Sequence, residues 1–410
     1  MGILISGASI AGPVLAYWLH RYGFDVTVVE RAPQLRKTGG HPVDLFRPAM
    51  DISEKMGVLP AIEAKVTGTE RMLMHRPGKK RPVTLDLRKM FGATSDRHVE
   101  IWRDDLSEIY YDATRGDVEY VFGDSITSIG EDGAVTFEHG APRRFDLVVG
   151  ADGLHSNVRR LIFGEESAYT AFVGAYIAVV SVPRDRGATP EETIMYYAPG
   201  RAAGVETSAY SDDARLGFLF RSAQPLTYDY RDAGRQKDIL REVFTGMDPQ
   251  VDKWLTELDD PLAFYFDSIT QLRMDTWSRG RVTLVGDAGY CPGPAVGGST
   301  SLAVVGAYVL AGELAAAGGD HERAFAAYER EMIGIVRDSR AFALGAAKVL
   351  IPRSRLGVWA TMQGIRLIGV LPTRLSRAVA KLNEKGLRLH DSMRIKDYPV
   401  PVPGTTSPDS

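Results

Sequence analysis

A glycine-rich turn near the start of the chain carries the residue types needed to hold a dinucleotide. Gly7 and Gly12 have the outer spacing of a G-x-G-x-x-G turn, in which Ser9 replaces the middle glycine, and Glu30 follows 23 positions after Gly7. Such glycines let the backbone approach a pyrophosphate, a helix N-terminus supplies amide donors, and the acid accepts hydrogen bonds from ribose hydroxyls. We predict that the dinucleotide-binding residues here are Gly7, Ser9, Ile10, Ala11, Gly12 and Glu30.

Two later pairs of glycine and aspartate also follow apolar runs. Asp152-Gly153 follows residues 145–150, and Gly286-Asp287 follows residues 281–285. A short acid after a strand is suited to accept hydrogen bonds from a ribose-type hydroxyl. Asp152 is also placed to cap a helix that begins near Ser156, and both roles are compatible.

The elements around these residues predict a split nucleotide-binding domain. Residues 2–31 read as strand, turn, helix and strand, and residues 281–287 return to a buried strand after a β-rich region at about 165–270. From Ser301 the pattern is helical almost to Leu389. No second glycine fingerprint is followed by a helix start and an acid, so a nicotinamide cofactor would have no domain of its own.

Composition excludes several classes of function. The chain has 410 residues, a net charge of −3 and no dense basic stripe, which argues against a nucleic-acid partner. The single Cys291 forms no internal disulfide, which suits a reducing compartment, so we predict a cytoplasmic protein. One cysteine and scattered histidines also provide no set of ligands for structural zinc. The apolar run at 302–312 is too short to cross a bilayer, and we expect no stable membrane insertion.

Three motifs together resemble the FAD-dependent aromatic hydroxylases, the group A flavoprotein monooxygenases. They are GASIAG with its downstream Glu30-Arg31, GADGLHSNVRR at 150–160 and RVTLVGDAGYCPGP at 281–294. Three further segments resemble the tetracycline-inactivating flavin monooxygenases, namely AGPVLAYWLHRYGF at 11–24, FYFDSITQLRM at 264–274 and SLAVVGAYVLAGEL at 301–314. The resemblance covers nearly the whole chain.

The resemblance implies an α/β fold like that of p-hydroxybenzoate hydroxylase. It has a split Rossmann-like FAD-binding domain, an inserted β-sheet substrate domain and C-terminal helices, here expected to bury an apolar stripe that includes Leu356, Val358, Trp359, Met362, Ile365 and Ile368. The predicted boundaries are 1–70, 100–165 and 280–340 for the FAD-binding domain, 71–99 and 166–279 for the sheet domain, 341–395 for the helices and 396–410 for a flexible tail.

The resemblance also implies that FAD is reduced by NADPH and reacts with O₂ as a C4a-hydroperoxide, which hydroxylates a polycyclic phenol or enol. Tetracycline-type antibiotics are the most specific candidates, with an aromatic polyketide of a biosynthetic pathway as the alternative. A halogenase is disfavoured because the chain has no W-x-W-x-I-P segment. A flavin-binding protein without turnover is the alternative from another class, and we expect a monomer or weak dimer.

Further cofactor-binding residues are carried over from the same families. Arg103 matches an arginine placed against FAD, although an exposed helical arginine is the alternative, and Arg36 and Asp44 match positions for NADPH and FAD. The Gly/Pro segment at 292–298 would set a helix N-terminus beside the flavin pyrimidine, or form a simple turn. Its Gly-Gly-Ser-Thr-Ser replaces the Gly-Gln-Gly-Asn-Asn common in relatives, which puts flavin affinity or mobility in question. The full additional set is Arg31, Arg36, Asp44, Arg103, Asp152, Gly153, Gly286, Asp287, Pro294, Gly297 and Gly298.

The substrate site is expected on the inserted sheet. Its strands carry aromatic side chains with one arginine, which would suit a polycyclic ligand with anionic oxygens, although core packing is the commoner fate of such aromatics. The candidates on these strands are Phe220, Arg221, Tyr265 and Phe266, and His41 in the preceding glycine loop is a further candidate. We assign no catalytic acid, base or metal ligand, because in this chemistry the cofactor performs the oxygen transfer.

Overall fold

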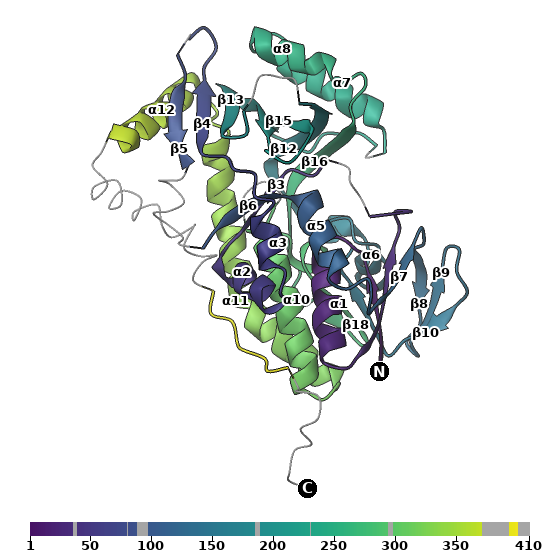
Figure 1. Cartoon of the computed structure of the whole chain (residues 1–410). Coiled ribbons are helices and arrows are strands. Elements are labelled where there is room, and N and C mark those ends of the chain that lie inside the picture. The colour runs from purple at the N-terminus through teal and green to yellow at the C-terminus, as the bar shows by residue number, and fades with distance from the viewer. Residues whose placement is uncertain are drawn as a thin grey trace.

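The chain folds into two layered parts joined by long helices (Figure 1). The computed structural model describes residues 1–35, 39–79, 81–87, 97–184, 189–229, 231–293, 298–370 and 393–400, except for the side chains of 345–349 and 368–370. One part contains a parallel sheet near the N-terminus, and the other contains a larger sheet at the top of Figure 1.

The first sheet is parallel except at one edge. Its innermost strand is fully buried, since Ile3, Leu4 and Ile5 have no exposed surface. In spatial order its strands are β17 (Ser278–Arg279), β18 (Val282–Leu284), β11 (Leu147–Gly150), β1 (Gly2–Ser6), β2 (Asp25–Glu30) and β7 (Glu119–Phe122), with only β17 antiparallel to its neighbour. Because β1 lies between β2 and β11, the chain order reverses at β1, and ligands of α/β sheets bind at such a reversal.

Helices and small sheets surround this sheet. The helix α1 (Ala11–Arg21) packs against α10 (Ser299–Ala316), which also contacts α11 (His321–Leu350). The remaining elements of this part are α2 (Arg47–Lys55), α3 (Leu59–Glu63), α5 (Arg103–Asp112), α6 (Asn157–Phe163), α9 (Asp287–Tyr290), the ribbon of β3 (Pro42–Leu45) and β6 (Val99–Trp102), and the meander of β8 (Ile126–Ile129), β9 (Ala134–Phe137) and β10 (Arg143–Arg144).

The second sheet has seven strands, of which β4 and β5 come from an earlier part of the chain. Its strands in spatial order are β16 (Ala263–Leu272), β12 (Thr170–Pro183), β15 (Asp213–Arg221), β14 (Arg201–Thr207), β13 (Glu192–Ala198), β4 (Arg71–His75) and β5 (Val83–Asp86). A short 3₁₀ turn, Glu166–Ala168, precedes β12. The fold thus confirms the predicted α/β class with an added sheet, whereas the exact domain boundaries stay a prediction.

The two faces of the seven-stranded sheet have different covers. On one face, buried side chains of β12, β15 and β16 pack against α7 (Ala233–Phe244) and α8 (Pro249–Thr256). On the other face, Ile177 and Val179 pack with Ile351, which follows α11. The period-2 alternation of each strand therefore decides which residues can face the flavin-binding part.

The helix α10 is the core helix of the first part. Within the described residues it is the one helix that is long and apolar enough to cross a membrane by length and composition. Most of it is buried against α1, α2 and α11, as expected for the central helix of a packed core.

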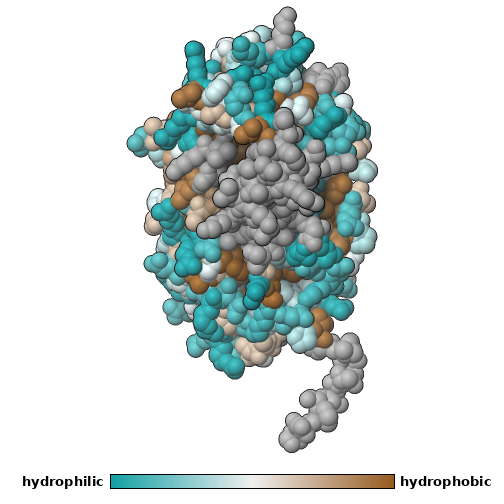
Figure 2. All heavy atoms as spheres, turned by 90° about the vertical axis from the view of Figure 1, so that its left-hand side faces the viewer, coloured by the Kyte–Doolittle hydropathy of each residue, from teal (hydrophilic) through white to brown (hydrophobic). Residues whose placement is uncertain are grey.

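The C-terminal stripe is buried only in part. On α12 (Arg355–Val370), Val358 and Met362 are buried against the sheet, whereas Leu356 and Trp359 are 71% and 49% exposed. Val358 and Met362 are four residues apart and share one helical face, from which the other two point away. The side of Figure 1 that carries α12 faces the viewer in Figure 2, which shows hydrophobic patches among hydrophilic side chains there. The expectation of a fully buried stripe is therefore wrong for Leu356 and Trp359, while the side chain of Ile368 lies outside the described residues.

Within the predicted tail at 396–410, Tyr398 is a buried anchor, whereas Lys396, Asp397 and Pro399 around it are exposed. Tyr398 is 5% exposed, and its hydroxyl donates a hydrogen bond to Glu313 Oε1 at 2.7 Å. Its ring lies against Gly312, where an added Cβ would come within 2.2 Å of the ring. A neighbouring ion pair joins Asp397 to Lys55 at 2.5 Å. Residues 401–410 lie outside the described part of the chain.

Candidate functional site

Three predicted glycine turns meet at one edge of the parallel sheet. They follow β1, β11 and β18, whose carboxyl ends are adjacent. Backbone hydrogen bonds from Ala151 N to Ser6 O (2.8 Å) and from Val285 N to Gly150 O (2.9 Å) join the ends of these strands, and Gly7 N donates to Val29 O of β2 (2.8 Å). Segments nearly 300 residues apart in sequence therefore build one site.

The first turn is a cradle that only glycine fits. Gly7 has a φ of +108°, and a Cβ there would lie 2.5 Å from Ala151 O. A Cβ on Gly12 would lie 1.9 Å from Gly7 O. Ile10 occupies the N-cap position of α1 and Ala11 begins the helix, and no side chain among the described residues caps this end. The first amides of α1 are thus available to an anionic ligand such as a pyrophosphate.

Glu30 reaches back to the same turn. Its Oε2 accepts a hydrogen bond from Ala8 N at 3.0 Å, and its Oε1 accepts one from Ala32 N at 2.8 Å. The acid at the end of β2 therefore lies beside the start of α1, where the ribose hydroxyls of a dinucleotide are expected. Arg31, the next residue, is exposed to solvent.

Arg103 is the first residue of α5 and extends toward the glycine turn. Its Nη2 donates a hydrogen bond to Ser9 Oγ at 3.1 Å, while Ser107 Oγ donates to Ser9 O at 3.0 Å. The Ser9 side chain therefore forms a hydrogen bond to α5 that a glycine could not form. Since Arg103 is also exposed, its remaining donors are accessible, and a guanidinium suits a phosphate or a planar ring.

The loop at 39–41 passes tightly between α5 and β12. A Cβ on Gly40 would meet Arg103 Cβ at 2.8 Å, and Gly40 N donates a hydrogen bond to Asp104 Oδ2 at 3.0 Å. Burial, together with the positive charge of Arg103, lowers the pKa of His41 to about 4. His41 is therefore neutral at pH 7 and lies beside Arg103. Arg36 lies outside the described residues.

Asp44 is engaged by His98, a histidine that lies outside the three sequence motifs. Its Oδ1 lies 2.7 Å from His98 Nε2, and its backbone oxygen accepts a hydrogen bond from Ser301 Oγ at 3.2 Å. Ser301 belongs to the first turn of α10, so Asp44 links the ribbon of β3 and β6 to the helix start that was expected beside the flavin. Gly298 occupies the N-cap of that helix with a φ of +85°, and Pro294 and Gly297 lie outside the described residues.

The other two aspartates differ in their surroundings. Asp152 binds the start of α6, whose N-cap is Ser156: its carboxylate accepts hydrogen bonds from Asn157 N (2.9 Å), Val158 N (3.1 Å) and Ser156 Oγ (2.5 Å). Gly153 beside it has a φ of +80° and open space around it. Asp287 begins α9, and burial raises its pKa while the charge of Arg103 opposes that shift. Asp287 therefore shares the neighbourhood of Arg103, and Gly286 with a φ of +67° makes the turn that places it there.

His155 joins the second motif to the inserted sheet. Its Nδ1 lies 2.9 Å from Glu166 Oε1 and its Nε2 lies 3.1 Å from Asp267 Oδ2. Hydrogen bonds to these two carboxylates raise the pKa of His155 to about 10, so it is protonated at pH 7. Asp267 also accepts a hydrogen bond from the Tyr265 hydroxyl at 3.2 Å. The members of this cluster are more than 110 residues apart in sequence, so no local sequence pattern predicts their contact.

The predicted substrate residues fall on opposite faces of the sheet. Tyr265 lies on the face toward the glycine turns, and Arg103 is close enough to oppose the rise that burial causes in the pKa of this tyrosine. Phe220 and Phe266 instead pack into the core beneath α7 and α8. Their expected contact with a substrate at the flavin is therefore corrected, because alternate residues of a strand point to opposite faces. The Nε of Arg221 donates to Ile351 O at 2.6 Å.

The sequence motifs also did not identify a partly buried pair of carboxyl groups. Glu100 on β6 and Glu206 on β14 share a side-chain hydrogen bond. Thr67 Oγ1 donates to Glu100 Oε1 at 2.6 Å, and Asp44 is the strand partner of Glu100. Burial first, and then the neighbouring carboxylates, raise the pKa of both glutamates, that of Glu206 well above its usual range. A proton shared between Glu100 and Glu206 therefore links the ribbon of β3 and β6 to the seven-stranded sheet.

We expect Glu206→Gln to remove a pH dependence of stability. In the unfolded chain the carboxyl ionises near pH 4.5, whereas in the folded chain it keeps its proton to a higher pH. The free energy of unfolding should therefore fall as the pH rises between these two values, by about 1.4 kcal/mol per pH unit at most. The variant should lack this fall and be more stable than the wild type at high pH. Urea unfolding from pH 5 to 9 measures this, with the exposed Glu131→Gln as control, and parallel wild-type and Glu206→Gln profiles would contradict it.

The comparisons with known proteins agree with this architecture. The family described as FAD binding domain matches residues 1–339. The chain is 42% identical to an uncharacterized protein of Mycobacterium tuberculosis, over 82% of this chain and 90% of that protein. It is 36% identical to a flavin-dependent monooxygenase of Legionella longbeachae, over 86% and 90% of the two chains.

A solved structure extends the similarity to the whole fold. The tetracycline destructase Tet(55) superimposes with a TM-score of 0.81 and 32% identity, and the match covers 97% of this chain and 98% of that one. The family match, the sequence relatives and the cradle at Gly7 and Gly12 agree with one another. The chain therefore belongs to the family of FAD-dependent monooxygenases with the fold of the group A aromatic hydroxylases.

Proposed function

We propose that this monooxygenase uses NADPH to hydroxylate a polycyclic phenolic or enolic compound, and that tetracycline-type antibiotics are among its substrates. The observation that carries the proposal is the likeness to a tetracycline destructase over nearly the full length of both chains. The neutral His41, the exposed Arg103 and the phenol of Tyr265, which lie close to one another, support it, because together they offer polar contacts to an oxygen-rich ring system.

The residues present fit a flavin dinucleotide. The cradle of Gly7 and Gly12 would admit the pyrophosphate to the N-terminus of α1, and Glu30 would accept hydrogen bonds from the ribose. Arg103 and Asp287 would hold the middle of the cofactor, with Gly298 at the helix start beyond it. When bound, the flavin supplies the activation of O₂ and the transfer of one oxygen atom to the substrate.

The protein's own contribution is to position the substrate and to fix its protonation. The hydroxyl proton of Tyr265 is committed to Asp267, which His155 holds in place, so the tyrosine oxygen can accept a hydrogen bond from a substrate hydroxyl. Arg103 supplies positive charge close to Tyr265 and Asp287 and favours the ionised form of a phenol or enol. Electron density on the ring that receives oxygen rises when that group ionises.

The test is consumption of NADPH and O₂ by the FAD-loaded enzyme. Tetracyclines, aromatic polyketides and simple phenols would each be added, with mass analysis for the gain of one oxygen atom and with catalase to reveal uncoupled peroxide. We expect tetracyclines to stimulate NADPH oxidation and to gain oxygen. Turnover of polyketides alone would identify a biosynthetic hydroxylase, and a yellow protein that oxidises NADPH with none of these compounds would contradict the proposal.

A further inference from the structure

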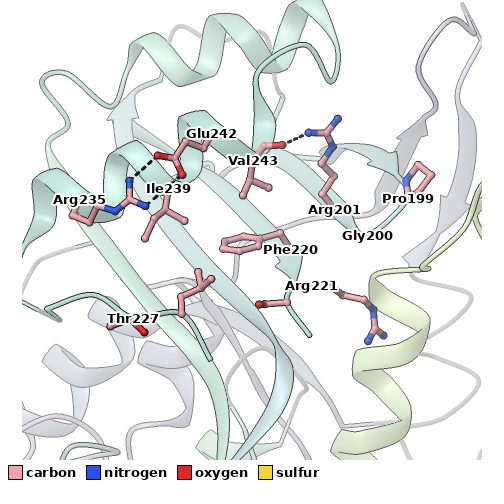
Figure 3. Close-up of a pocket in the computed structure, with 12 residues that line it drawn as sticks. Pro199, Gly200, Arg201, Phe220, Arg221, Thr227, Arg235, Ile239, Glu242 and Val243 are labelled. Carbon is pink, nitrogen blue, oxygen red and sulfur yellow. Dashed lines mark hydrogen bonds and ion pairs between the residues drawn. The ribbon is translucent and has the colours of Figure 1, made fainter. Parts of the chain in front are cut away.

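A cavity of about 480 Å³ lies at the ends of β14 and β15, on the face of the sheet that α7 covers. We call it the α7 cavity (Figure 3). It is separate from the flavin site, because the side chains on this face of the sheet point away from Tyr265 and the glycine turns. Its lining residues are Pro199, Gly200, Arg201, Phe220, Arg221, Ser222, Leu226, Thr227, Arg235, Ile239, Glu242 and Val243.

The floor of the α7 cavity is apolar. Phe220 and Ile239 are 3% and 4% exposed, and Figure 3 shows their side chains between the strand ends and the helix. Tyr176 stacks against Phe220 with ring centroids 5.2 Å apart, which fixes the orientation of the floor. The volume is in the range of small-molecule sites, so the cavity has room for a molecule of two or three rings.

The rim of the α7 cavity is positively charged. Its lining has three arginines and a single acid, Glu242, which pairs with Arg235 at 2.7 Å. Arg201 donates to the backbone oxygen of Val243, and within the described part of the chain no carboxylate pairs with it. The Nε of Arg221 donates to Ile351 O, and burial together with nearby Arg353 lowers the pKa of Arg221. A carboxylate bound here would place a negative charge beside Arg201.

We propose that the α7 cavity is an accessory site for a small organic anion with an apolar body, of the class of aromatic carboxylates. The apolar floor would bury the ring, and Arg201 and Arg235 would meet the carboxylate at the rim. Glu242 limits affinity, because it competes for Arg235 and repels the ligand. The sequence singled out Phe220 as a ligand-binding aromatic, and the structure places it in this cavity instead of at the flavin.

Removing the charge of Glu242 and removing the charge of Arg235 should change the affinity for an anion in opposite directions, which provides the test. The FAD-loaded enzyme would be titrated calorimetrically with 2-naphthoate and with the neutral 2-naphthamide. We expect Glu242→Gln to tighten naphthoate binding about threefold to tenfold, and Arg235→Gln to weaken it by at least about threefold. Binding of the amide should change in neither variant. Added salt should weaken binding of the acid only.

The exposed ion pair of Arg143 and Glu119, at 2.8 Å on the flavin-binding part, provides matched controls. Glu119→Gln and Arg143→Gln change the net charge of the protein by the same amounts but should leave naphthoate affinity unaltered. If the control variants changed naphthoate affinity as much as the Glu242 and Arg235 variants did, naphthoate would bind outside the α7 cavity. The proposal would then be wrong. Equal affinity for acid and amide would also overturn it, because the cavity would then have no preference for anions.

Discussion

Gly12→Ala should yield a protein that is largely colourless, because it loses FAD. The new methyl would lie 1.9 Å from the backbone oxygen of Gly7, and backbone cannot move aside as a flexible side chain can. The start of α1 must therefore shift, which takes its amides away from the pyrophosphate. Overpacking of this kind costs about 1–3 kcal/mol, so the dissociation constant for FAD should rise about tenfold to a hundredfold. Titration of the apoprotein, followed by flavin fluorescence, measures this.

A helical glycine in open space is the matched control for this substitution. Gly334 on α11 has nothing within 4 Å of an added Cβ, so Gly334→Ala should bind FAD normally and gain up to about 1 kcal/mol of helix stability. If Gly12→Ala bound FAD as tightly as Gly334→Ala, the turn at Gly7 could not be the pyrophosphate cradle.

Tyr398→Ala should lower the free energy of unfolding by about 3–5 kcal/mol, as for other buried aromatics. The ring is 5% exposed and fills the space that Gly312 leaves open on α10. Its loss would leave a cavity and would remove the hydrogen bond to Glu313, a side chain that is only 8% exposed. Urea unfolding of the FAD-loaded protein is the appropriate measurement.

Tyr398→Phe separates the ring from its hydroxyl. Because Lys396 still pairs with Glu313 at 2.9 Å, the loss should be about 1 kcal/mol. An unfolding midpoint of Tyr398→Ala equal to that of the wild type would show that the Tyr398 side chain contributes nothing to stability.

The glycine turn could be predicted from sequence because its chemistry is local. Gly7, Gly12 and Glu30 lie within one strand–helix–strand unit, so spacing alone predicts their meeting. The flavin-binding part of the fold followed from three such local motifs. Their individual contacts with the cofactor stay predictions.

What sequence could not predict depends on contacts between distant segments. The alternation of side chains along a strand shows that Phe220 and Tyr265 each point to the opposite face from the next residue in the strand. It does not show which face of the sheet α7 covers. Glu100 and Glu206 are more than 100 residues apart, and each looks like an ordinary surface acid. Tyr398 lies among prolines and charged residues, and only the space beside Gly312 makes it a core residue.

The split of the parallel sheet also has a consequence for biosynthesis. The central strand β1 leaves the ribosome before β18 and the turn at Gly286, which follow some 280 residues later. The intervening sheet has its own core beneath α7 and α8 and can pack while the first sheet is still unfinished. The cofactor site can therefore close only after β18 has been synthesised, and contacts over such a separation in sequence form slowly.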